Sequence, residues 1–306
     1  MSRRTDRSTK EIHKFIMEHA TENMTMDEIN ALLNEHMDEI NARITKPVTE
    51  ETAETADDLL NLAEERLEKG DEQGALRLAR KALRLEPDNL DAELFILNHE
   101  KLEPEDYLRR MEMALEKGKL NLEKQGFFED DCIGEFWHMI ETRPYMRLRD
   151  QYVSMLVELG KLRKAAAEAE GMIRLCTQDN LGVRFTLMHL YAALEEADAA
   201  ETLLKKYSEH DECQMLLALT LLYYKLDDTD KAEKYLRRLT KANKETRAFI
   251  RDLFSDQLKR KLSVIQGKGG YSPFSEEELI MAYSENEDVY TGAPLFFRWM
   301  AKALKM

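Results

Sequence analysis

The stretch that decides the fold is ADDLLNLAEERLEKGDEQGALRLARKALRLEPDN, residues 56–89. Gly70 divides it into two segments in which leucine and alanine recur every three or four residues, as on one face of a helix. Ala75 and Ala79 are small enough to let the second helix approach the first closely, and Pro87 stops the second helix from continuing. The stretch therefore predicts a pair of packed helices joined by a tight turn at Gly70.

The same marks return further along the chain at nearly constant spacing. The later turn residues, each with the alanine that follows it by five residues, are Gly160 with Ala165, Glu195 with Ala200, and Asp227 with Ala232. These turn residues are separated by 35 residues (195 − 160) and 32 residues (227 − 195). Such spacing is close to a repeat of 34 residues, so we expect several similar helix pairs stacked along the chain.

A helix pair of this length with these marks resembles the tetratricopeptide repeat, although the aromatic positions of that repeat are occupied here by leucine and arginine. The phrase ETRPYMR at residues 141–147 is similar to one found in a group of poorly characterised prokaryotic tetratricopeptide proteins. Residues 179–184, DNLGVR, are similar to a second phrase of that group. The resemblance covers roughly residues 50–300. It implies the repeat fold and brings no known activity.

We therefore predict an all-α protein, an α-α superhelix with helical capping elements at its N- and C-terminal ends, because a repeat array must cover its last apolar faces. The predicted parts are an N-terminal helical pair at 1–48, a repeat and a divergent repeat-like pair at 56–126, a connector at 127–145, three repeats at 146–245, and a C-terminal helical cap at 246–306. Capping boxes at Ser8–Glu11 and Thr25–Glu28 are expected to begin the N-terminal helices, and one amphipathic helix is expected over 246–262.

Composition narrows the class of partner. The formal net charge of −15 disfavours nucleic acid, which requires a basic surface. The most apolar window, residues 215–224, is too short for a membrane span, which needs about 20 residues. The basic N-terminus is not followed by the apolar run of a secretory signal. Three widely spaced cysteines fit a reducing compartment, so we expect a cytoplasmic protein.

Catalytic and metal-binding patterns are weak. Cys132 and His138 are six residues apart, and a thiol–imidazole pair would need contact in space, so we favour a packed cysteine and histidine. Residues 267–270, GKGG, lack the spacing of a phosphate-binding loop. The histidines and cysteines show no metal-ligand spacing. We expect no enzyme activity, no cofactor and no metal.

The candidate site is the groove that the first helix of each pair would line, because positions on one helix face recur with the helical period. The predicted groove residues are Arg143, Arg147, Asp150, Ser154, Phe185, His189 and Tyr224. Two readings are open for the arginines, which either anchor an acidic peptide or pair with internal acids such as Asp150 and Asp179. The groove residues likewise either face a partner or pack against the terminal helices.

The function that these observations favour is non-catalytic protein–protein interaction, with a peptide or partner protein bound in the groove. One alternative is an enzyme or regulator whose activity lies in the terminal regions. Another is a self-assembling structural protein, a homodimer for example, in which Ile29, Leu32 and Leu33 face a second copy. The sequence does not name the partner.

Overall fold

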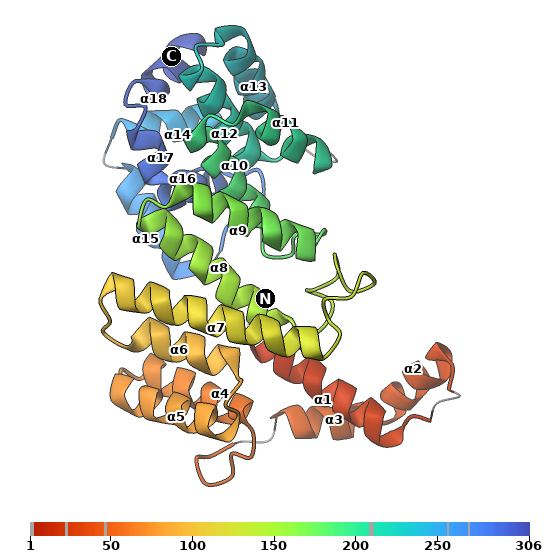
Figure 1. Ribbon diagram of the computed structural model, residues 1–306. Coiled ribbons are helices and arrows are strands. Elements are labelled where there is room, and N and C mark those ends of the chain that lie inside the picture. The colour runs from red at the N-terminus through yellow and green to blue at the C-terminus, as the bar shows by residue number, and fades with distance from the viewer. Residues whose placement is uncertain (1–2, 22–23, 46–47, 208–210, 256, 269) are drawn as a thin grey trace. The chain divides into compact units, whose positions relative to one another are not determined.

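The computed structural model describes the whole chain except residues 1–2, 22–23, 46–47, 208–210, 256 and 269. Within the described residues the chain forms 18 α-helices and no β-strand (Figure 1), which confirms the predicted all-α repeat fold. The chain divides into two compact units, and each is described by itself. Unit 1 comprises residues 1–155 and 174–181, and unit 2 comprises residues 156–173 and 182–306.

The helices of the first half of the chain are α1 (Arg3–His19), α2 (Met26–Glu35), α3 (Met37–Thr45), α4 (Ala56–Glu68), α5 (Glu72–Leu85), α6 (Leu90–His99), α7 (Pro104–Lys124) and α8 (Arg143–Glu158). Those that follow are α9 (Leu162–Leu175), α10 (Val183–Leu194), α11 (Ala197–Lys206), α12 (Cys213–Lys225) and α13 (Thr229–Ala242). The C-terminal helices are α14 (Thr246–Leu253), α15 (Gln257–Lys268), α16 (Glu276–Glu285), α17 (Glu287–Thr291) and α18 (Phe296–Ala303).

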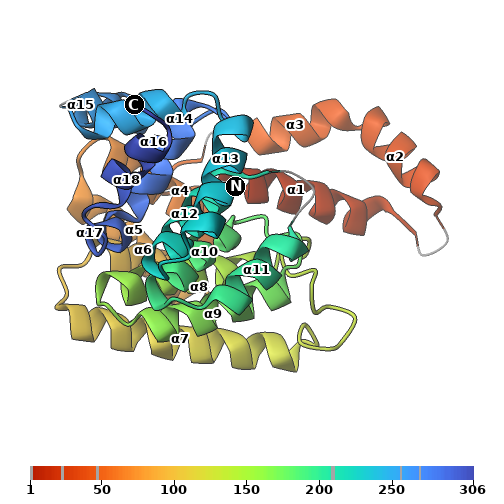
Figure 2. The same ribbon diagram turned by 90° about the horizontal axis from the view of Figure 1, so that it is seen from above.

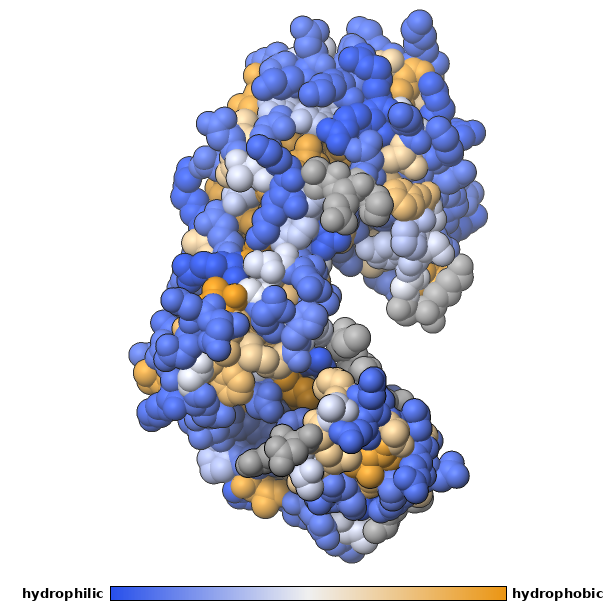
Figure 3. Space-filling model, turned by 90° about the vertical axis from the view of Figure 1, so that its right-hand side faces the viewer, coloured by the Kyte–Doolittle hydropathy of each residue, from blue (hydrophilic) through white to orange (hydrophobic). Residues whose placement is uncertain are grey.

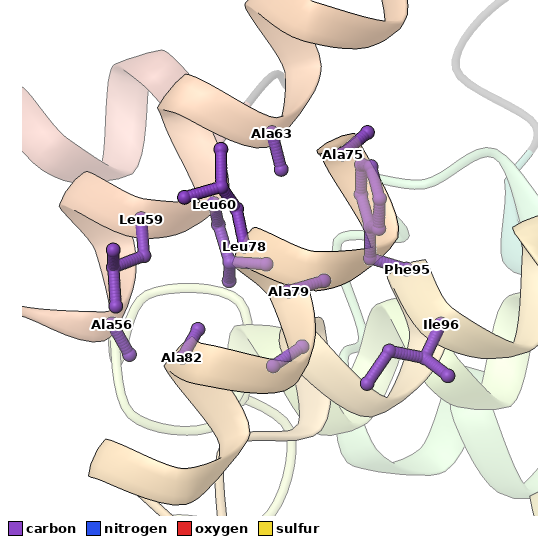
Figure 4. Close-up of a cluster of buried hydrophobic side chains, with 11 residues drawn as sticks. Ala56, Leu59, Leu60, Ala63, Ala75, Leu78, Ala79, Ala82, Phe95 and Ile96 are labelled. Carbon is purple, nitrogen blue, oxygen red and sulfur yellow. The ribbon is translucent and has the colours of Figure 1, made fainter. Parts of the chain in front are cut away.

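Unit 1 is built on the stack of α4, α5, α6 and α7, which lie as successive layers in Figure 1. The core between α4, α5 and α6 combines alanines with leucines and one aromatic ring (Figure 4). Ala63, Ala75 and Ala79 are fully buried there beside Leu60 and Leu78. Small residues at facing positions let the helix axes approach, and the leucines then fill the space that remains, as close packing of a core requires.

The turns that join the two helices of each pair confirm the predicted register. Each turn residue has a left-handed backbone: Gly70 (φ 80°), Gly160 (φ 67°), Glu195 (φ 63°) and Asp227 (φ 57°). The alanine five residues after each of them is fully buried: Ala75, Ala165, Ala200 and Ala232. Only glycine adopts this conformation without cost, so Glu195 and Asp227 accept a strained backbone in order to keep the same turn.

The segment between α7 and α8 belongs to unit 1 and pairs with residues 174–181. The Gly134 amide donates to the Leu175 carbonyl (3.1 Å), and the Thr177 amide donates to the Gly134 carbonyl (2.9 Å). Phe136 and Trp137 of this segment are buried. These contacts fix the connector against the loop before α10 without forming a strand.

The N-terminal helices α1, α2 and α3 form a small arm with its own core. α1 and α3 lie side by side in Figure 2, and Phe15 and Ile40 are buried between them. The Phe15 ring stacks on His19 with the centroids 4.2 Å apart, and Arg43 of α3 lies over the same ring and pairs with Glu18. The arm therefore buries its largest apolar side chain, that of Phe15, in its own core.

Unit 2 is organised around α12. Its residues from Cys213 to Tyr223 are all buried, so this helix has no solvent-facing side over three turns. α10 and α13 pack against it, and α16 packs on it as well. A helix that is buried all round must be covered in every direction. The apolar window at residues 215–224 therefore lies at the centre of unit 2.

Three expectations for the helix boundaries differ from the structure. α1 begins at Arg3, so Ser8 lies inside the helix and is not its first residue, because the residues before it contain no helix breaker. The stretch expected as one helix over 246–262 is two helices, α14 and α15. The second N-terminal helix is divided into α2 and α3 at His36, whose Nδ1 bonds the Leu32 carbonyl (3.0 Å). The Thr25 capping box is present as predicted.

Across the part of the chain that the structure describes, no helix combines the length and the apolar character that crossing a membrane requires.

Replacing Ala165 with leucine should overpack the interior against which this fully buried alanine lies. We expect the free energy of unfolding to fall by about 1–3 kcal/mol, measured by urea denaturation. The control is Ala167→Leu, two residues away on the exposed side of α9, which should leave stability nearly unchanged. Equal stability of the two variants would contradict the register assigned to the repeats.

Candidate protein-binding groove

The predicted groove residues lie on three helices. α8 carries Arg143, Arg147, Asp150 and Ser154 in unit 1, whereas Phe185 and His189 of α10 and Tyr224 of α12 are in unit 2. Continuity of the groove over both units stays a prediction. Within each unit, the environment of each side chain separates the residues held by internal contacts from those that face solvent.

The arginines of α8 are engaged inside unit 1. Arg147 forms a bidentate ion pair with Asp91 of α6, through Nε to Oδ1 (2.9 Å) and Nη2 to Oδ2 (2.6 Å). Asp91 is only 7% exposed and Arg147 only 16%, so this pair is shielded from solvent and fixes α8 on α6. Arg143 donates from Nε to the Trp137 carbonyl (2.8 Å) and lies over the Trp137 ring. The geometry supports the internal reading of these two arginines.

Asp150 has a different environment. Its carboxylate is half-buried, and no ion pair or side-chain hydrogen bond to it occurs among the described residues. Desolvation, and after it the charge of Asp179, raises the pKa of Asp150 to about 6. Ser154, one turn further on α8, is exposed and its hydroxyl donates to the Asp150 carbonyl (3.2 Å). This part of α8 thus offers a carboxylate that a cation from another molecule would stabilise.

Phe185 begins the groove face of α10 and is half-buried. The Arg184 guanidinium lies 4.2 Å from the centroid of its ring and is itself held by a bidentate pair with Glu212, at 2.9 and 2.6 Å. An aromatic ring held in this way is pre-organised for contact with another surface. The ion pair between Arg184 and Glu212 was not predicted, since the two residues are 28 positions apart and neither belongs to a repeated pattern.

His189 is fully buried. Its Nδ1 lies 2.8 Å from the Phe185 carbonyl and must therefore carry the proton, so Nε2 accepts from the hydroxyl of Tyr290 at 2.8 Å. Burial lowers the pKa of His189 to about 4. His189 joins α10 to α17 of the C-terminal region, and a partner cannot touch it in this state.

Tyr224 also packs against the C-terminal region. Its ring centroid lies 5.4 Å from that of Phe296 and 5.3 Å from that of Trp299, both on α18. Gln214, at the start of the same helix α12, donates to the hydroxyl of Tyr271 (2.7 Å). The C-terminal helices therefore lie over the groove side of α10 and α12. The aromatic residues of the tail were visible in the sequence, but nothing there indicated which face they would cover.

The expectation that Cys132 and His138 are packed in the interior is wrong, because Cys132 is half-buried and His138 is exposed. Desolvation and the charge of Asp131 raise the pKa of the Cys132 thiol, which is opposite to the shift that activates a cysteine nucleophile. His138 lies 3.7 Å from Glu135 in an exposed pair. Among the described residues, no group of three or more His, Cys, Asp or Glu side chains is placed to hold a metal ion.

Comparison with known proteins adds little to this geometry. No family model matches the chain, and no curated protein matches its sequence. Among solved structures, the chain is similar to one described as Assembly Chaperone of RpL4 (Acl4), residues 1–338. The match has 12% sequence identity and a TM-score of 0.28, and it covers 90% of this chain and 93% of that one. The function has to be argued from this chain's own residues.

His189 should make stability depend on pH in a defined direction. Its pKa is lower in the folded state (about 4) than in the unfolded chain (6.5), so the unfolded state binds more protons between these values. The free energy of unfolding should therefore fall as pH decreases from about 6.5 to about 4, by up to about 3 kcal/mol. Urea denaturation at several pH values should show that His189→Gln removes this loss. The exposed-site control His138→Gln should retain it, and identical pH profiles for the two variants would contradict the assignment.

Asp150 should make the free energy of unfolding depend on pH in the opposite direction to His189. Its folded-state pKa (about 6) lies above its ordinary value (3.8), so the folded state binds more protons in that window and stability falls as pH rises through it. Asp150→Asn should raise the free energy of unfolding at pH 7.5 by about 1–3 kcal/mol, and should have little effect at pH 3.5. Asp230→Asn, at an exposed site on α13, is the control. A destabilised Asp150→Asn protein at pH 7.5 would show that this carboxylate has an internal partner.

Proposed function

We propose that the chain is a non-catalytic protein-interaction module that binds a segment of a partner protein on the groove faces its own terminal helices leave open. The observation that carries the proposal is the division of the groove residues into two groups. His189 and Tyr224 are covered by α17 and α18. Asp150 and Phe185 are half-buried and Ser154 is exposed, so these three residues have surface that a partner can contact.

The chemistry of the open residues suits a peptide segment. Asp150 would gain an ion pair from a lysine or arginine, and that pair would offset the cost of desolvation that the carboxylate already bears. Phe185 offers an aromatic ring whose orientation is fixed by Arg184, and rings of this kind supply much of the binding energy in protein interfaces. The face of the molecule in Figure 3 is mainly hydrophilic, with apolar side chains in separate patches.

The net charge of −15 supports a partner with basic character. Charge of this sign accelerates encounter with a basic protein and slows encounter with nucleic acid. The strongly shifted pKa values support a binding role over a catalytic one. The pKa of His189 is shifted by burial in the packed interior, and that of Tyr191 by burial beside Glu170. A cytoplasmic location and a reducing environment for the cysteines Cys132, Cys176 and Cys213 remain part of the proposal.

Replacing Phe185 with alanine should weaken partner capture by more than about 1 kcal/mol, which is roughly a fivefold loss of affinity. The partner would be identified by affinity capture from the source organism and its binding then measured by titration calorimetry. Thermal unfolding should change little, because Phe185 is half-buried before binding. Phe254→Ala, at a phenylalanine 55% exposed, is the matched control and should bind like the parent.

Tyr224→Ala is expected to behave differently. Its ring packs on Phe296 and Trp299, so the substitution should lower stability by about 2–4 kcal/mol. If Phe185→Ala captures the partner as well as the parent and Phe254→Ala do, the groove is not the binding surface.

A further inference from the structure

The last helix of unit 2, α18, has an apolar side and a basic side. Phe296 and Met300 are fully buried on its apolar side. The opposite side is exposed and carries residues spaced by three or four positions, which places them in one line along the helix: Leu295, Arg298, Lys302 and Lys305. α18 therefore covers the core of unit 2 with one side and turns a line of cations to solvent with the other.

α14 has the same arrangement. Phe249 and Ile250 are fully buried on its inner side. Its exposed side carries Arg247, Arg251 and Phe254, which are again three or four positions apart and so lie in one line. Two neighbouring helices of unit 2 thus present basic lines to solvent.

The two lines meet and form one surface. α14 and α18 pack together near the C-terminus (Figure 1), and the ring centroids of Phe249 and Phe297 are 6.0 Å apart between them. The Arg247 guanidinium donates from Nη1 to the Leu304 carbonyl (2.8 Å), and Lys305 follows Leu304 directly. The beginning of the α14 line therefore lies beside the end of the α18 line. We call these two lines together the basic face.

The basic face is cationic although the whole chain has a net charge of −15. Its charged members are all arginine or lysine, and all of them are exposed. The one acidic residue within α14 and α18 is Asp252, whose Oδ2 lies 2.6 Å from Nζ of Lys261, so its charge is offset inside the unit. Lys244 and Glu245, the exposed residues just before α14, offset each other.

The apolar members of the basic face indicate the chemistry of what it contacts. The side chain of Leu295 is 57% exposed and that of Phe254 is 55% exposed, each at one end of a basic line. The phosphates of a nucleic acid or the carboxylates of an acidic segment would satisfy the cations alone. An anionic lipid bilayer satisfies both kinds of side chain, because its headgroups are negatively charged and the region beneath them is apolar.

We propose that the basic face docks the protein on the surface of an anionic lipid membrane. The arginines and lysines contact the headgroups, while Leu295 and Phe254 reach toward the acyl chains. The acidic remainder of the chain does not prevent this contact, because charges more than about 8 Å away are largely screened at physiological ionic strength. Docking of this kind is peripheral and does not require the groove at Phe185.

The test is cosedimentation of the full-length protein with vesicles of phosphatidylcholine alone or of an equal mixture of phosphatidylcholine and phosphatidylglycerol. The protein should bind the mixed vesicles, lose binding as salt is added, and stay in solution with the neutral vesicles. Arg298→Gln/Lys302→Gln should lower the partition coefficient on mixed vesicles about 25-fold, roughly fivefold for each cation removed. The control Lys161→Gln/Lys205→Gln removes two exposed lysines of unit 2 outside the basic face and should bind like the parent.

The apolar contribution is tested without a change of charge. Leu295→Ser should lower the partition coefficient on mixed vesicles at least about fivefold, because each methylene group placed in the acyl region adds to membrane affinity. Leu120→Ser, at a leucine of unit 1 that is 51% exposed, is the matched control and should bind like the parent. Thermal unfolding should be similar for all of these variants, because the substituted side chains are exposed.

Failure of the parent to bind mixed vesicles, or equal binding to neutral and mixed vesicles, would overturn the proposal. So would an Arg298→Gln/Lys302→Gln protein that binds like its control, because the contact would then lie elsewhere. Weakened binding of that variant together with unchanged binding of Leu295→Ser would also overturn it, since a surface recognised by charge alone fits an acidic protein or a nucleic acid. The vesicle assay contains no partner protein, so its failure is distinct from failure of the groove at Phe185.

Discussion

The structure depends on the requirement that α12 be covered on all sides. Eleven consecutive residues of this helix, from Cys213 to Tyr223, are buried, whereas a helix at the surface of a repeat array normally leaves one face to solvent. Each large apolar side chain removed from water contributes about 1.5–3 kcal/mol, so leaving one side of α12 open would cost several such contributions. α10 and α13 supply part of the cover, and the chain after Asn243 has to supply the rest.

This requirement explains why the C-terminal helices lie on the groove face. The neutral His189 bonds Tyr290, Tyr224 packs on Phe296 and Trp299, and Gln214 bonds Tyr271. The surface that a repeat protein would ordinarily offer to a partner is used in unit 2 to complete the core. In unit 1 the N-terminal helix α1 contacts α4 through the ion pair of Lys10 with Asp57.

The repeats could be predicted from sequence because their signals are local. A turn residue and an alanine five positions later define the register within a single helix pair, and the structure places all four such turns in the left-handed region with the alanine buried. The groove could be predicted as a set of helix positions but not as a free surface, because whether Tyr224 meets solvent depends on residues more than 70 positions away (296 − 224 = 72). The partner of Arg147 could not be predicted either, because Asp91 lies 56 positions earlier and the sequence does not distinguish it from the many other acidic residues. The predicted helix start at Ser8 is wrong although its signal is local, because the capping pattern falls inside a helix that already begins at Arg3.

The central claim is that the C-terminal helices are part of the core of unit 2, because they complete the cover of α12. Hydrogen exchange of the full-length protein, read by mass spectrometry, tests it directly because exchange measures the free energy of local opening. The account predicts that amides of α16 and α18 exchange together with those of α12, near the limit set by global unfolding. Exchange of α16 and α18 well before α12 would contradict it.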